Sequence, residues 1–154
     1  MKAGILVDKI DSSQLGFNIT NSINKISQEM VNVDIIVFTK SPSVPCVTPL
    51  FSIMSETEVW GFNAPVISTD IATASTLIES VGPTKKYFYM WDLEWIRLQD
   101  FMHRDLSKIY NNKNIELISR SKRHAEITGK CWKYPSHIMK DFNHADLIRI
   151  LKNE

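Results

Sequence analysis

Short apolar runs alternate with longer segments in which apolar residues recur every three or four positions along the 154-residue chain. Short runs of mostly apolar residues, rich in β-branched and aromatic types, are typical of strands that are buried on both faces. Five such strands are predicted, at residues 3–8, 33–40, 64–69, 85–91 and 115–119.

The three- and four-residue spacing is typical of helices that bury one face. Capping residues mark two of the helix starts, because Thr69 or Asp70 opens the second helix and Asp141 or Asn143 opens the last. Prolines exclude a regular helix from residues 41–54 and leave a loop with a short extended piece. Helices are predicted at residues 17–30, 71–80, 92–110, 121–132 and 141–154. In the helix at residues 92–110, the apolar side chains expected to face inward are Leu93, Ile96, Phe101 and Leu106.

The alternation of strands and helices predicts an α/β fold. We expect a single three-layer Rossmann-like domain over residues 1–154, with helices on both faces of a mostly parallel sheet of about five strands. Ligands of such sheets bind beyond the carboxyl ends of the strands, where helix N-termini converge. Those ends are predicted at Asp8, Thr39, Ser68, Trp91 and Ser119.

Composition and charge narrow the classes of partner. Hydrophobic residues make up 44% of the chain and the formal net charge is +1, so a nucleic acid partner is not expected. Cys46 and Cys131 have no zinc-site or disulfide-framework spacing, and no cofactor fingerprint such as G-x-G-x-x-G is present. The first apolar run ends at Asp8 and is too short for a signal peptide or a membrane span, so a cytoplasmic protein is expected.

The loop from residue 8 to residue 16 is the first candidate binding segment. Asp8, Ser13 and Gly16 are candidates to hold an anion or a sugar, because serines and a glycine leave backbone amides approachable. Ordinary strand-to-helix turns use the same residue types, and we favour that structural interpretation.

Hydroxyl groups at the next strand ends form a second candidate segment. Ser68, Thr69 and Asp70 combine two hydroxyls with a carboxylate, and Thr39 ends the second strand. Helix capping explains the Ser68 to Asp70 segment and still permits contact with a substrate.

Asp92, Leu93 and Glu94 follow the aromatic strand that ends at Trp91. Two carboxylates at this spacing resemble the Asp-x-Asp motif of metal-dependent glycosyltransferases, with Glu94 in place of the second Asp. The alternative is that Asp92 caps a helix whose first turn contains Glu94, which we favour. Trp91 and Trp95 are expected at the ligand edge, where an aromatic face can stack on a sugar or a base.

Arg120 and Ser121 open the penultimate helix within a basic cluster, residues 120–124. Such residues at a helix N-terminus are candidates to bind phosphate, although a basic run is usually a solvated helix face. The four histidines share no metal-ligand spacing with each other or with a cysteine, and no metal site is predicted from them.

The order of these segments resembles the N-terminal half of a glycosyltransferase with the twin-Rossmann (GT-B) architecture. The resemblance is carried by the strands "AGILVD", "VDIIVFTK" and "KKYFYMWDLEW", and by "IELISRSKRHAEI", in which a strand ends in an Arg-Ser pair before a helix. It spans most of the chain. The terminal segment "DFNHADLIRILKNE" resembles the C-terminal helix of such enzymes.

The resemblance implies that the chain binds a nucleotide sugar or its sugar acceptor. Family members hold the donor mainly through a second Rossmann domain, often with two glutamates eight residues apart, and no glutamate pair in this chain has that spacing. A second Rossmann domain on another chain, or a homodimer, is therefore an expected partner. The alternatives are a non-catalytic protein-interaction module and a metal-dependent glycosyltransferase that uses the Asp-x-Glu motif.

Overall fold

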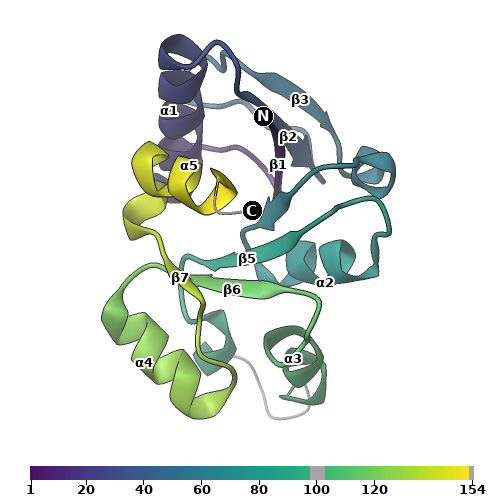
Figure 1. Cartoon of the computed structure of the whole chain (residues 1–154), viewed down its shortest axis with the longest axis vertical. Coiled ribbons are helices and arrows are strands. Elements are labelled where there is room, and N and C mark those ends of the chain that lie inside the picture. Colours follow the sequence, from purple (N-terminus) through teal and green to yellow (C-terminus); the bar gives the residue numbers. More distant parts are fainter. Residues whose placement is uncertain (98–102, 153–154) are drawn as a thin grey trace.

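The computed structural model describes residues 1–97 and 103–152. Seven strands alternate with helices along this part of the chain (Figure 1). The elements are β1 Lys2–Val7, α1 Gln14–Glu29, β2 Asp34–Thr39, β3 Ser52–Ser55, η1 Glu56–Gly61, β4 Val66–Ser68, α2 Ile71–Glu79, β5 Lys86–Met90, η2 Glu94–Arg97, α3 His103–Tyr110, β6 Glu116–Ser119, α4 Lys122–Cys131, β7 His137–Ile138, η4 Lys140–Phe142 and α5 His144–Lys152.

All seven strands belong to one parallel sheet with the order β3-β2-β1-β4-β5-β6-β7. This is the doubly wound Rossmann order, extended by one strand at the β6 edge. The α/β class and the parallel sheet are confirmed, and each predicted strand occurs within two residues of its expected ends. The connection from β1 leads to β2 on one side, whereas β4 lies on the other side of β1, so the topological switch point falls between β1 and β4.

The expected number of about five strands is wrong, because both outer strands lack the pattern that marks a buried strand. β3 is exposed at all four positions, and β7 has only two residues. A buried central strand is recognisable by its apolar run, but an outer strand that is exposed or very short is not.

Helices cover both faces of the sheet (Figure 1). On the first face, α1 and α5 pack side by side, and the Ile19, Ile23 and Ile26 side chains of α1 are buried against the strands. On the second face, α2 and α3 bury Leu77 and Leu106. The helix α4 also lies on the second face, where the Thr128 hydroxyl donates to the sulfur of Met90 at 3.9 Å.

Two helices differ from their predicted extents. An α-helix was expected from residue 92, but residues 92–93 are not helical and the 3₁₀ turn η2 follows. Ile96 was expected to face inward, but it is 60% exposed. The similar expectation for Phe101 lies outside the described residues. In the terminal segment Asn143 caps α5, since its Oδ1 accepts from the Asp146 amide at 2.9 Å, and Asp141 instead lies in a left-handed turn with φ of 50°.

Within the two described ranges, no helix combines the length and the apolar character that crossing a bilayer requires.

Candidate functional site

A cavity of about 190 Å³ opens at the carboxyl ends of β1, β4 and β5, beside the topological switch point. We call it the first cavity. Six of the predicted site residues line it and come from three separate segments of the chain, which the parallel sheet brings to one edge. The lining residues are Val7, Asp8, Lys9, Asp11, Ser13, Leu15, Gly16, Ile19, Thr69, Asp70, Trp91 and Glu94.

The β1–α1 loop forms one wall of the first cavity. Ser13 caps α1, because its Oγ accepts from the Gly16 amide at 3.1 Å, and the Ser13 amide donates to Asp11 Oδ1 at 3.0 Å. A side chain at Gly16 would meet the Asp11 carbonyl oxygen closer than van der Waals contact allows. Hydrogen bonds from Ser13 lower the pKa of Asp11, so the negative charge of this wall is maintained. Because the loop's own side chains occupy these amides, the loop offers few donors to an anion.

The segment after β4 forms the opposite wall. Ser68 is fully buried and donates to the Tyr87 carbonyl oxygen at 3.0 Å, so it supports the sheet and does not reach the cavity. Asp70 caps α2 in a capping box, in which its Oδ1 accepts from the Thr73 amide at 2.9 Å. Thr69 and Asp70 do line the first cavity. The sequence predicted Thr69 or Asp70 as the cap, and the structure shows that Asp70 is the cap and lies where a ligand can also reach it.

Asp92 and Glu94 bind different partners. Asp92 accepts from the adjacent Leu93 amide at 2.9 Å and pairs with Arg97 at 2.8 Å, whereas Glu94 lines the first cavity and accepts from the Ile71 amide at 3.4 Å. The cap from Asp92 to the amides near Glu94 is therefore replaced by a tighter turn. No group of three or more His, Cys, Asp or Glu side chains suitable for a metal ion occurs in the part of the chain that the structure describes.

Burial raises the pKa of Glu94, and the neighbouring carboxylates of Asp70 and Asp92 raise it further. The folded structure therefore favours the protonated form of Glu94. From the sequence, Glu94 is expected only as a metal ligand or as a residue of a first helical turn. The lack of a local signal is expected, since the role of Glu94 depends on contact with α2, more than twenty residues earlier in the chain.

Of the two tryptophans that were expected at the ligand edge, only Trp91 is found there. Trp91 packs against the buried side chains on the first face of the sheet, which α1 and α5 cover, and it lines the first cavity. Trp95 instead packs on the second face, with ring centroids 6.5 Å from Tyr110 and 6.0 Å from Trp132. The 3₁₀ turn η2 directs Trp95 toward α3, and its predicted place in the crevice is wrong. Thr39 ends β2 opposite Val7 and Ser55 and is not among the residues that line the first cavity.

A second cavity of about 460 Å³ lies next to the first, at the ends of β6 and β7. Arg120 connects the two cavities, because its guanidinium carbon lies 3.8 Å from the centroid of the Trp91 ring. Arg120 Nε and Nη2 also lie 2.8 and 2.7 Å from Asp141 Oδ1. Ser121 caps α4, with its Oγ accepting from the His124 amide at 3.2 Å. The residues lining the second cavity are Arg120, Ser121, His124, Ile138, Lys140 and Asp141.

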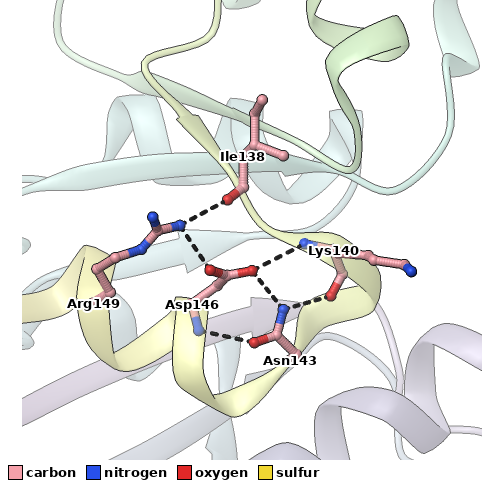
Figure 2. Close-up of polar contacts among 5 residues, drawn as sticks. All are labelled: Ile138, Lys140, Asn143, Asp146 and Arg149. Carbon is pink, nitrogen blue, oxygen red and sulfur yellow. Dashed lines mark hydrogen bonds and ion pairs between the residues drawn. The ribbon is translucent and has the colours of Figure 1, made fainter.

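Lys140 and Asp141 were not predicted as site residues, since they lie about twenty positions from Arg120 and share no motif with it. A polar network beneath them holds their loop (Figure 2). Asp146 accepts from Asn143 Nδ2 at 2.6 Å and from the Lys140 amide at 3.4 Å, and it also pairs with Arg149 at 2.7 Å. Arg149 in turn donates to the Ile138 carbonyl oxygen at 3.2 Å, so the network joins β7 to the first turn of α5.

The parallel sheet, its strand order and a cavity at the switch point define a Rossmann-like α/β protein. Comparison of the chain with protein-family models, with curated proteins and with solved structures gave no match.

Proposed function

We propose that this chain is a glycosyltransferase-like domain that binds a nucleotide sugar, or the sugar acceptor, at the carboxyl ends of its strands. The observation that carries the proposal is the first cavity, which lies beside the topological switch point and is lined by Asp8, Asp70, Glu94 and Trp91. Carboxylates accept hydrogen bonds from sugar hydroxyls, and an indole ring offers an apolar face to the carbon side of a sugar ring.

The charge and size of the first cavity suit the sugar of a nucleotide sugar better than its nucleotide diphosphate. Four carboxylates and one ammonium group line it, and that ammonium group, Lys9, lies 3.4 Å from Asp11. A diphosphate would be repelled there, whereas uncharged hydroxyls would not. Its volume of about 190 Å³ is below the range of ~300–1,000 Å³ that is typical of pockets for larger ligands. We therefore infer that one sugar ring, and not a whole nucleotide sugar, occupies it.

Catalysis in this proposal requires a second Rossmann domain, on another chain or on a second copy. In this proposal the described sheet takes the place of one half of the twin-Rossmann arrangement, and the donor nucleotide in such enzymes is held mainly by the other half.

A non-catalytic interaction module is the second candidate function, and one observation favours it. Apolar side chains are exposed along the outer strand β3 and the adjoining η1, where an unpaired strand edge is also available for pairing. These side chains are Ile53 and Met54 of β3 and Trp60 of η1, together with Leu50 just before β3.

Calorimetric titration with uridine, guanosine and adenosine diphosphate sugars separates the two functions. We expect one of them to bind, and Asp8→Asn to weaken that binding about tenfold or more, since a hydrogen bond to a charged acceptor contributes ~1.5–3 kcal/mol. Asp105→Asn removes the same charge from the exposed surface of α3 and is the matched control, with no change expected. If no nucleotide sugar binds, alone or in the presence of a second domain, the interaction module is favoured.

A further inference from the structure

The second cavity has the opposite charge character to the first. Arg120 and Lys140 line it together with the imidazole of His124, and Asp141 is its one carboxylate. The volume of about 460 Å³ falls within the range of ligand pockets, and the cavity is large enough for a phosphate or a diphosphate. An anion is therefore the class of ligand that the second cavity suits.

Arg120 is held in one orientation by two contacts. The Trp91 ring lies against the face of the guanidinium, and Asp141 Oδ1 contacts Nε and Nη2 along one edge. A guanidinium has five N–H donors, and Asp141 engages only two of the three nitrogens. The Nη1 donors have no protein partner among the described residues. Because the side chain is fixed and its remaining edge is free, Arg120 is preorganised to bind an oxyanion with two parallel hydrogen bonds.

The loop that carries Lys140 and Asp141 is also fixed. Asp141 and Phe142 both have positive φ, at 50° and 54°, a conformation that non-glycine residues adopt rarely. The Phe142 amide donates to Tyr89 Oη at 3.2 Å, and the Ser22 hydroxyl donates to the Phe142 carbonyl oxygen at 2.7 Å. Figure 2 shows the Lys140 side chain extending away from the Asp146 network, which binds only its backbone. The surrounding structure thus maintains a strained turn, which is characteristic of functional sites.

The geometry points to the second cavity as an anion subsite that binds the phosphate or diphosphate of the same ligand whose sugar enters the first cavity. Trp91 lines the first cavity and is in contact with Arg120, which lines the second, so the two cavities are neighbours along the strand ends, and we infer that one ligand extends over this contact into both. The assignment of the anion to a sugar ligand rests on the proposed function, whereas binding of the anion itself does not. The substrate class is then a phosphorylated sugar, and Arg120 and Lys140 bind its charged end.

Pyrophosphate is the probe that tests the anion subsite without a sugar. In an NMR titration of the whole chain, amide shifts should concentrate at residues 120–124 and 138–141, and binding should weaken as salt is added. Lys140→Gln should weaken binding about fivefold to tenfold, because one charge is lost from the cavity. Lys113→Gln removes an equally exposed lysine from a different basic pocket, formed with Lys85 and Lys86, and should change the affinity less than twofold.

Arg120→Lys is the second variant, since it keeps the charge and loses the planar fork. We expect it to weaken pyrophosphate binding by a similar factor, with the folded state checked from the amide spectrum. Equal effects of Lys140→Gln and Lys113→Gln, or pyrophosphate shifts outside the second cavity, would overturn the anion subsite. A neutral methyl glycoside tests the first cavity separately. If the glycoside causes amide shifts and pyrophosphate does not, the proposed function stands and the anion subsite is wrong. If pyrophosphate causes shifts and the glycoside does not, the anion subsite stands and sugar binding in the first cavity is wrong.

Discussion

The ionisation of Glu94 in the first cavity depends on its surroundings. Its folded pKa is raised by burial and by Asp70 and Asp92, so protonated Glu94 is favoured in the folded state. A raised folded pKa contributes stability that is fully present below the ordinary value near 4.5 and is lost as the pH rises through the raised value. Charged Glu94 therefore costs stability at neutral pH.

Replacement of Glu94 by Gln should consequently stabilise the protein at pH 7 to 8, and this gain should disappear as the pH falls below about 4. The Gln side chain can still accept from the Ile71 amide. Urea unfolding across this pH range measures the effect, and Glu126→Gln on the exposed face of α4 is the control. A gain that is the same at pH 4 and at pH 8 would show that the effect has another cause than ionisation.

Residue identity predicted which residues cap helices more reliably than it predicted on which face of the sheet a side chain lies. Asp70 as a cap could be read from the sequence, because a cap depends on neighbours within one turn. Trp91 and Trp95 are four positions apart and look alike in the sequence, yet they lie on opposite faces of the sheet. Their separation depends on the 3₁₀ turn η2, and a helical period cannot predict it.

At the scale of elements, α5 determines where the loop of the second cavity lies. Its first-turn residue Asp146 accepts from Asn143 and Lys140 and pairs with Arg149 (Figure 2). Asp146→Ala should lower the free energy of unfolding by about 1–2 kcal/mol, since several hydrogen bonds to one charged acceptor are lost while part of the site is exposed.

Asp105→Ala is the control for α5, because Asp105 pairs only with Lys108 in the described structure and its side chain is 69% exposed. We expect this change to alter the free energy of unfolding by less than about 0.5 kcal/mol. Urea denaturation compares the two variants. If both cost the same, the Asp146 network does not hold α5 and the loop in place.

At the scale of the whole molecule, the central strands of the sheet can be predicted from the sequence, whereas the outer strands cannot. β1, β2, β4, β5 and β6 have apolar runs because helices cover both of their faces, and all five were predicted. β3 and β7 form through pairing with a neighbour along one side, and that interaction leaves no periodic pattern in the sequence. The same reason explains the site, since the first cavity lies at the ends of predicted central strands and the second cavity requires β7 and η4.

The most direct test of the account is an NMR titration of the whole chain with the nucleotide diphosphate sugars. The first cavity is already formed by one chain, so even weak, millimolar binding should be detected without a second domain. We predict amide shifts in residues 8–16, 69–71 and 91–94 with a shift of the Trp91 indole resonance, where the sugar binds, and further shifts in residues 120–124 and 138–141, where the diphosphate binds. The absence of shifts with every nucleotide sugar, or shifts confined to residues around β3, would contradict the account.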